Sequence, residues 1–194
     1  MTNTNNGKGK VIIVSGPSGV GKSTICKEIL KKLDYVYLSV SVTTRPKSEV
    51  EVDGQDYWFV SEEDFQERID KDLLLEYAEV FGHLYGTPKD KVNEAMQAGK
   101  VVILEIDVQG AIKTKEVFPD AVMIFILAPS EKDLAKRLNH RGREASEVAE
   151  ERLNGASTEI AAAWQHYEQM VINEDLQQAV NECVQIIENS KSET

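Results

Sequence analysis

A short apolar segment that leads directly into a glycine-rich loop constrains the fold of this chain more than any other feature. Residues 11–14 are apolar and β-branched, which is typical of a strand buried on both faces of a sheet. Glycines follow at once, and after them comes a helical pattern. Its apolar face is formed by Ile25, Ile29, Leu30 and Leu33. The order strand, turn, helix predicts an α/β fold built on a parallel sheet.

The loop at residues 16–23 matches the phosphate-binding pattern G-x-x-x-x-G-K-[ST]. Its glycines let backbone N–H groups approach phosphates, and the helix that begins near Lys22 adds the positive end of its dipole. We expect Lys22 to lie between the β- and γ-phosphates, and the hydroxyl of Ser23 to bind Mg²⁺ with the nucleotide. The predicted ATP-binding residues here are Gly16, Pro17, Ser18, Gly19, Val20, Gly21, Lys22, Ser23 and Thr24. Such a loop does not identify the reaction, because GTPases, ATPases and kinases all use one.

Two further apolar segments predict buried strands, at residues 101–107 and 122–127. Helical segments separate them, so we expect a parallel sheet with helices on both faces. Residues 170–172 are a candidate fourth strand. A final helix, from about 176 to 189, is expected to turn six residues inward: Leu176, Ala179, Val180, Cys183, Ile186 and Ile187. We interpret Cys26 and Cys183 as small core residues.

The middle of the chain, about residues 42–87, breaks this alternation. Short strands are predicted at 57–60, 76–81 and 84–85, with Trp58 and Phe59 in the core of a small sheet. Two helix starts are predicted, one capped by Ser61 and one with Pro88 in its first turn. This region is expected to be a small mixed α+β insertion in the α/β core.

Composition limits what the chain can bind. With 22 basic and 33 acidic residues the net charge is −11, which argues against nucleic-acid binding because that requires a basic face. A small anion is not excluded, since a cleft focuses the field of a few cations. Residues 1–9 are polar and are expected to be a disordered tail rather than a signal peptide. No apolar run could span a bilayer, so we expect a cytoplasmic protein that does not bind membranes.

Five segments complete an ordered series with the loop: residues 41–46, 54–59, 76–78, 85–87 and 106–110. This series closely resembles the guanylate kinase family, from about Lys10 to Glu188. The resemblance implies a single P-loop NTPase-type domain over 10–190. Its core would be 10–41 and 88–190, with a GMP-binding insertion at about 42–87 and a helical lid at about 137–152. It implies transfer of the γ-phosphate of ATP to GMP, and to dGMP as a further acceptor, in purine nucleotide metabolism.

The resemblance also implies a role for each residue of the acceptor site. Glu76 would accept hydrogen bonds from N1–H and the N2 amino group of guanine, whereas the unprotonated N1 of adenine would leave its carboxylate unpaired. Ser41 and Thr87 would contact the base, and Arg45, Tyr57 and Tyr85 would hold the GMP phosphate. Asp107 ends a predicted strand beside the loop strand. Both GMP binding and water-mediated Mg²⁺ binding, as by a Walker-B carboxylate, remain open for it.

One stretch departs from the family pattern, which usually reads x-Pro-Arg-x-Gly-Glu after the Thr-Thr-Arg segment. Counting back from Gly54, Ser48 occupies the position of the second arginine, which also grips the GMP phosphate, and Val50 occupies the glycine position. Lys47 lies one residue away and is a candidate to supply the missing charge. We hypothesise that GMP is otherwise bound with one fewer charge-assisted pair of hydrogen bonds.

Four arginines gather within residues 137–152: Arg137, Arg141, Arg143 and Arg152. By pattern alone, a solvated helical face paired with nearby glutamates would explain them. The resemblance maps Arg137, Arg141 and Arg152 onto lid arginines around the transferred phosphoryl group, and with Lys22 and Arg45 they are the predicted catalytic residues. Asn173 matches a family position near adenine; a helix N-cap region is the alternative.

The function that the resemblance implies is that of an ATP:GMP phosphotransferase that uses Mg²⁺ with ATP and acts as a monomer or homodimer. Two alternatives remain open at this point. One is a non-catalytic guanylate-kinase-like module that binds protein partners, although such modules typically lack a complete phosphate loop. The other is a P-loop kinase with a different nucleoside monophosphate as acceptor.

Overall fold

The computed structural model describes residues 9–80, 82–140 and 146–192, and no side chain is described for 139–154 or 192. Its main sheet has five parallel strands in the order β2-β7-β1-β8-β9. The strands are β1 (Lys10–Ser15), β2 (Val36–Leu38), β7 (Val101–Glu105), β8 (Val122–Leu127) and β9 (Gln169–Ile172). The predicted parallel α/β fold is confirmed, and the loop strand β1 lies at its centre.

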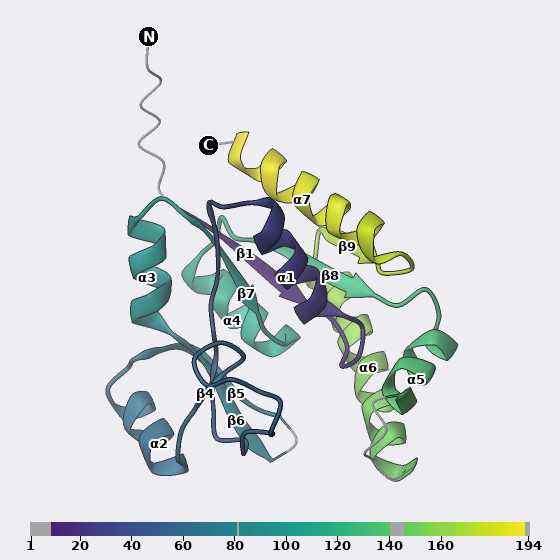
Figure 1. Ribbon diagram of the computed structural model, residues 1–194, viewed down its shortest axis with the longest axis horizontal. Coiled ribbons are helices and arrows are strands. Elements are labelled where there is room, and N and C mark those ends of the chain that lie inside the picture. Colours follow the sequence, from purple (N-terminus) through teal and green to yellow (C-terminus); the bar gives the residue numbers. More distant parts are fainter. Residues whose placement is uncertain (1–8, 81, 141–145, 193–194) are drawn as a thin grey trace.

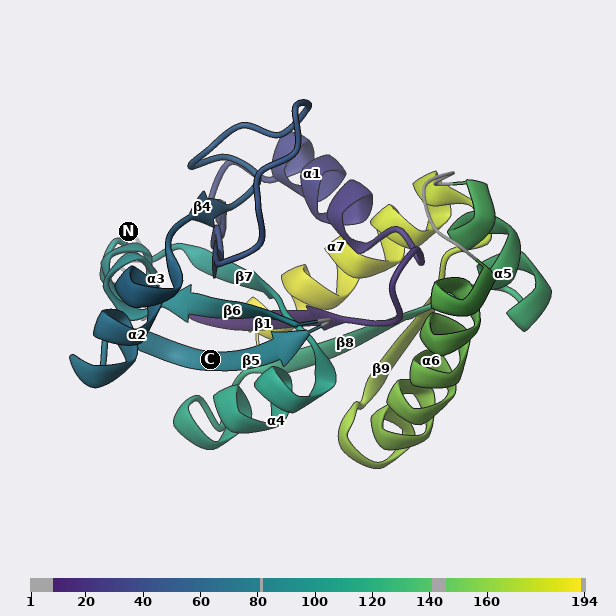
Figure 2. The ribbon, with the colours of Figure 1, turned by 90° about the horizontal axis from the view of Figure 1, so that it is seen from below.

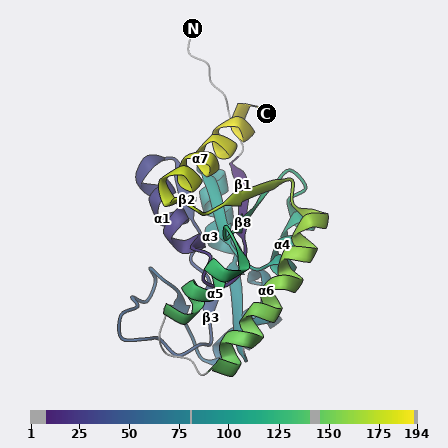
Figure 3. The same ribbon diagram turned by 90° about the vertical axis from the view of Figure 1, so that its right-hand side faces the viewer.

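Helices cover both faces of this sheet (Figure 3). On one face lie α1 (Lys22–Lys32) and α7 (Leu176–Ser192); on the other lie α3 (Lys89–Gln97), α4 (Val108–Val117) and α6 (Ser146–His166). Strand β1 is apolar over residues 11–14 because alternate side chains enter different cores. Ile12 and Val14 pack with α1 and α7, whereas Val11 and Ile13 pack with α3, α4 and α6.

A second sheet of four strands, in the order β4-β3-β6-β5, is formed by residues 42–88. Its elements are β3 (Val42–Thr43), β4 (Trp58–Phe59), α2 (Glu62–Asp70), β5 (Leu74–Val80) and β6 (His83–Pro88). The Ser61 hydroxyl accepts the N–H of Asp64 at 3.0 Å, which confirms the predicted helix cap. This sheet and α2 lie at one end of the molecule, and α5 (Glu131–His140) and α6 lie at the other (Figures 1 and 2). The loop between β1 and α1 lies between these two parts.

Several boundaries differ from those expected. Strand β7 ends at Glu105, and Asp107 is instead the N-cap of α4, where its carboxylate accepts the N–H of Gly110 at 2.7 Å. A helix cap of this kind satisfies an otherwise unpaired N–H group, so it competes with extension of the strand. Pro88 caps α3 rather than occupying its first turn. The short strand β2 was not predicted from the sequence; it pairs with β7.

Three side chains predicted to be core are not buried core. Trp58 is 41% exposed and packs across Gly54, and Phe59 is half-buried, because β4 is only two residues long and lies at the edge of its sheet. Leu176 is 39% exposed at the start of α7. Both cysteines are fully buried, as predicted. Within the described ranges, no helix is long and apolar enough to cross a membrane.

Candidate functional site

The glycine-rich loop connects β1 to α1 at the carboxyl end of the central strand, where open α/β sheets bind ligands. Gly16 has φ 148°, and a Cβ there would lie 2.4 Å from the carbonyl oxygen of Ile126 in β8. Only glycine lets the loop pass this close to the neighbouring strand. The ammonium group of Lys22 folds back over the loop and donates to the carbonyl oxygens of Gly16 at 2.5 Å and Pro17 at 3.2 Å.

Glu105 is a site residue that the sequence analysis missed. The Ser23 hydroxyl donates to its carboxylate at 2.6 Å. Glu105 is the last residue of β7, the strand beside β1, which is where a Walker-B carboxylate lies. The sequence placed Asp107 at the end of this strand, but the strand ends two residues earlier, at Glu105. Water-mediated Mg²⁺ binding by Asp107 stays a prediction. Burial, with a contribution from the charge of Glu105, raises the pKa of Tyr57 to about 12, so Glu105 also lies within electrostatic reach of the second sheet.

A cavity of about 770 Å³ opens beside the loop. Asn173, which is 7% exposed, donates its side-chain N–H to the carbonyl oxygen of Val20 at 2.8 Å. Arg137 donates to the same carbonyl at 3.2 Å and to that of Asn173 at 2.8 Å. Asn173 therefore ties the end of β9 to the loop, whereas Asp175 accepts the N–H of Gln178 in the first turn of α7. The cavity is lined by Gly19, Val20, Gly21, Thr24, Pro129, Asp133, Lys136, Arg137, Asn173, Glu174 and Leu176.

On the other side of the loop, a cluster in the second sheet brings together three of the predicted GMP-binding residues. The guanidinium carbon of Arg45 lies 5.3 Å from the ring centroid of Tyr57 and 5.6 Å from that of Phe59. The rings of Tyr57 and Tyr85 meet edge to face with centroids 5.8 Å apart. Aromatic faces attract a cation and fix its plane. Phe59, interpreted from the sequence as sheet core, instead helps to orient Arg45.

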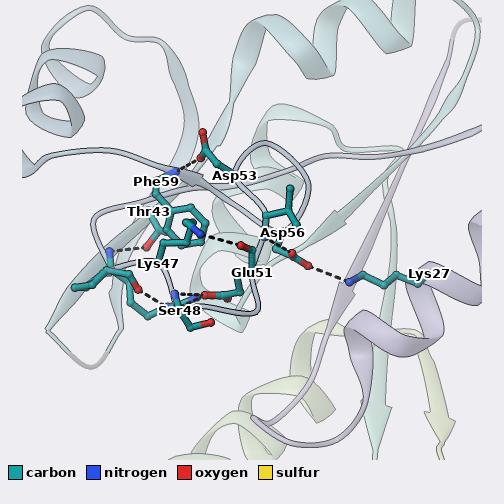
Figure 4. Close-up of polar contacts among 11 residues, drawn as sticks. Lys27, Thr43, Lys47, Ser48, Glu51, Asp53, Asp56 and Phe59 are labelled. Carbon is teal, nitrogen blue, oxygen red and sulfur yellow. Dashed lines mark hydrogen bonds and ion pairs between the residues drawn. The ribbon is translucent and has the colours of Figure 1, made fainter.

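Glu51 is the polar partner of that arginine and was also missed. Figure 4 shows Glu51 together with Lys47 and Ser48, which contact it as well. The two side chains form a paired contact, with Nη2 of Arg45 2.6 Å from Oε1 of Glu51 and Nη1 3.1 Å from Oε2. The N–H of Ser48 donates to Oε2 of Glu51 at 2.9 Å, and Nζ of Lys47 donates to the carbonyl oxygen of Glu51 at 3.1 Å. Hydrogen bonding to Arg45 lowers the pKa of Glu51 to about 2.

A single ion pair connects this loop to the core among the described residues. Lys27, in α1, lies 3.0 Å from the carboxylate of Asp56, which also accepts the N–H of Val52 (Figure 4). Both side chains are partly exposed, so the pair contributes little to stability on its own. It nevertheless joins the helix that follows the phosphate loop to the loop that carries Glu51.

Glu76 lies in β5 and is only 7% exposed. Its Oε1 accepts the hydroxyl hydrogen of Thr87 at 2.6 Å. Burial raises the pKa of Glu76 to about 7, with a smaller upward contribution from Asp107; Thr87 and Lys113 act in the opposite direction. The structure therefore brings Glu76, Thr87 and Asp107 together. Ser41 lies directly before β3, and its carbonyl oxygen accepts the N–H of Trp58.

The predicted lid residues are only partly covered. Arg137 lies in α5 and contacts the loop as above, whereas Arg141 and Arg143 lie outside the described residues. Arg152 lies in α6, but its side chain is outside the described part of the chain. Glu159, also in α6, has a pKa raised to about 7 by burial; Lys22 lowers it and Asp107 raises it, so its carboxylate lies within electrostatic reach of the phosphate loop. The sequence pattern carried no signal for it.

Oxygen donors at the phosphate loop suit a magnesium ion. Ser23 and Glu105 supply a hydroxyl and a carboxylate at the start of α1 and the end of β7, and Mg²⁺ in nucleotide sites takes few protein ligands, with phosphates and water completing its shell. Among the described residues there is no group of three or more histidine, cysteine, aspartate or glutamate side chains arranged to hold a metal.

Comparison with known proteins identifies the family of this chain. The family model for guanylate kinase matches residues 8–190. The chain is 45% identical over 185 residues to a guanylate kinase of Clostridioides difficile, covering 95% of this chain and 90% of the relative. It is 46% identical over 180 residues to one of Caldanaerobacter subterraneus, covering 93% and 87%. The crystal structure of guanylate kinase from Anaplasma phagocytophilum superposes with a TM-score of 0.80 at 32% identity, covering 96% of this chain and 88% of that one. The chain belongs to the guanylate kinase family.

Proposed function

We propose that this chain transfers the γ-phosphate of ATP to GMP, giving ADP and GDP. Family membership supports this reaction over the whole matched length. The observation that carries the choice of acceptor is the buried carboxylate of Glu76, which lies in the second sheet beside Thr87 and Asp107. A buried carboxylate is costly unless a ligand or neighbour pairs with it, so this site favours a base with two adjacent donors.

The donor nucleotide is proposed to occupy the cavity beside the phosphate loop. The loop N–H groups and the start of α1 would bind its phosphates, and Lys22 would turn from the loop carbonyls towards them. The base would lie near Asn173, whose amide already donates to Val20. Mg²⁺ bound with ATP would neutralise part of the charge of its phosphates. Ser23 and Glu105 are the residues that would hold it.

The acceptor is proposed to lie across the second sheet, with guanine at Glu76 and its phosphate at Arg45, Tyr57 and Tyr85. Arg45 is stacked on two aromatic rings and paired with Glu51, so its planar fork is oriented before the anion arrives. Glu51 occupies two of its five N–H donors, and the carbonyl oxygen of Pro46 accepts a third at 3.1 Å. The phosphate would then bind the remaining donors or displace Glu51.

The transfer itself needs no protein base. A phosphate monoester has a second pKa of about 6, so the attacking oxygen of GMP is already ionised at neutral pH. The protein must instead hold two polyanions in line, and Lys22 and Arg45 supply countercharge from two separate segments. Arg137, Arg141 and Arg152 are proposed to supply more from the lid. Closure of the two parts over the loop would exclude water and prevent hydrolysis of ATP.

The two alternative functions are not favoured. A protein-binding module would not need an intact phosphate loop, yet Gly16, Gly21, Lys22 and Ser23 are all present. A different acceptor would not explain a buried carboxylate at Glu76. A finer proposal concerns Lys47, which we propose partly replaces the charge missing at Ser48. Its ammonium group already donates to the carbonyl oxygen of Glu51, the residue whose carboxylate pairs with Arg45.

The test is an assay of ADP release with GMP, dGMP, AMP, CMP and UMP as acceptors, at a fixed concentration of ATP and Mg²⁺. We expect turnover with GMP, and equal or weaker turnover with dGMP. AMP, CMP and UMP should each be at least about 100-fold less efficient as acceptors. Glu76→Gln should abolish most of the preference for GMP over AMP, because the amide replaces one acceptor with a donor. No turnover with any acceptor would contradict the proposal, as would turnover only with a nucleotide that lacks guanine.

A further inference from the structure

Gly110 lies in the first turn of α4, directly behind the carboxylate of Glu76. A Cβ at this position would lie 2.6 Å from Oε2 of Glu76 and 3.1 Å from its Cδ. The shorter distance is one that real Cβ contacts essentially never show. Gly110 is not among the glycines with positive φ, so the helix itself would accept alanine there. The reason for glycine at 110 is therefore the carboxylate behind it.

A hydrogen bond holds each side of this contact in place. Oε1 of Glu76 is held by the hydroxyl of Thr87 at 2.6 Å, and the side chain is only 7% exposed. The first turn of α4 is held by its cap, because Asp107 accepts the N–H of Gly110 at 2.7 Å. Ala111, the next residue along α4, is fully buried. A methyl group at 110 would have to push Oε2 of Glu76 out of its place or break one of these two hydrogen bonds.

We propose that Gly110 is a specificity-positioning residue, whose missing side chain leaves the space in which Oε2 of Glu76 is held for the guanine base. The inference rests on the proposed function, in which the two carboxylate oxygens accept the N1–H and N2 amino hydrogens. Gly110 touches neither nucleotide in this account and acts only through Glu76. This role also explains why the motif at residues 106–110 ends in glycine, a residue to which no binding role was assigned.

IMP provides the chemical probe, because its base keeps N1–H but lacks the N2 amino group. Both acceptors therefore use one carboxylate oxygen, and only GMP uses the second. Gly110→Ala should lower kcat/KM for GMP by about tenfold or more, the size expected for a lost hydrogen bond to a charged group. It should lower the GMP-to-IMP ratio of kcat/KM by a similar factor. KM for ATP should stay unchanged, since the donor cavity lies on the other side of the phosphate loop.

The decisive experiment is a double-mutant cycle of Gly110→Ala with Glu76→Asp, measured by kcat/KM for GMP and by Tm. Aspartate withdraws the carboxylate by one methylene group, so alanine at 110 should cost much less in that background. The Tm of the Gly110→Ala variant should be lowered, and the double variant should recover that decrease. The Tm comparison therefore tests the contact even if the single variant folds poorly. Gly155→Ala is the matched control, because a Cβ at that helical glycine meets nothing within 4 Å. It should leave the GMP-to-IMP ratio of kcat/KM unchanged.

The outcomes separate this inference from the proposed function. If Glu76→Gln leaves the GMP-to-IMP ratio unchanged, guanine does not bind Glu76, and the proposed role of Glu76 fails together with the role of Gly110. If Glu76→Gln lowers the ratio but Gly110→Ala does not, only the Gly110 inference is overturned. Equal losses from Gly110→Ala in the natural chain and in the Glu76→Asp variant would also overturn it, as would a parallel rise in KM for ATP.

Discussion

Replacing Glu76 by glutamine should change how the stability of the folded enzyme depends on pH. The pKa of Glu76 is raised from 4.5 to about 7, chiefly by burial. A carboxyl with a higher pKa in the folded chain binds its proton more tightly there than in the unfolded chain. Its contribution to stability is therefore fully present below pH 4.5 and is lost as the pH rises through about 7. Glutamine has no such proton, so the variant should lack this part of the pH dependence.

The size of the effect follows from the same pKa. One pKa unit corresponds to about 1.4 kcal/mol, so keeping this buried carboxylate ionised costs about 3 kcal/mol of folding free energy. Thr87 from β6 and Lys113 and Asp107 from α4 face the group and are already included in this pKa. Relative to the natural chain, the glutamine variant should gain about 3 kcal/mol between pH 4.5 and pH 8. A constant offset from the changed hydrogen bond to Thr87 cancels in that difference.

Urea unfolding of both proteins at several pH values between 4.5 and about 8 measures this directly. Glu159 has a similarly raised pKa and contributes the same pH dependence to both proteins, so it cancels as well. The free energy of unfolding of the natural chain should fall towards alkaline pH more steeply than that of the variant. Two parallel curves would refute the reasoning, because Glu76 would then have the same pKa folded and unfolded. At neutral pH the variant should also be the poorer catalyst, because its amide no longer offers two acceptors to guanine.

Three further substitutions test the phosphate sites. Ser48→Arg should lower KM for GMP, because it adds a second guanidinium fork to the phosphate site beside Arg45; an unchanged or higher KM would count against the idea. Arg45→Lys should raise KM for GMP by about tenfold or more, since lysine lacks the fork that pairs with Glu51 and stacks on Tyr57; an equal KM in steady-state assays would contradict it. Glu105→Gln should lower kcat and raise the Mg²⁺ concentration needed for half-maximal rate, with KM for GMP little changed; an unaltered Mg²⁺ titration would exclude a metal-holding role for Glu105.

The parts of the fold that local pattern determines were predictable from the sequence. The run at residues 11–14 is apolar because both faces of β1 are buried, and the loop that follows has a spacing dictated by phosphate binding. Glu105 was missed because the apolar pattern does not mark where the strand ends. Glu105 and Asp107 are separated only by the apolar Ile106, so either acid could have been the last residue of the strand. Asp107 caps α4, so the strand cannot continue through it. The apolar pattern of the strand does not reveal this cap.

The contacts that orient the site depend on tertiary structure and were not predictable. Arg45 pairs with Glu51 only because the loop between them folds back, and Phe59 reaches Arg45 only because β4 lies beside β3. Glu76 and Gly110 are far apart in the sequence and meet where β5 packs on α4. The roles of Arg141 and Arg152 stay predictions from family resemblance.

A crystal structure with GMP bound tests most directly whether the buried carboxylate of Glu76 selects guanine while Arg45 holds the acceptor phosphate. The guanine N1 and N2 atoms should each lie about 3 Å from an oxygen of Glu76, and the GMP phosphate should lie within hydrogen-bonding distance of Arg45, Tyr57 and Tyr85. A guanine ring bound away from Glu76, or a phosphate bound away from Arg45, would contradict the account.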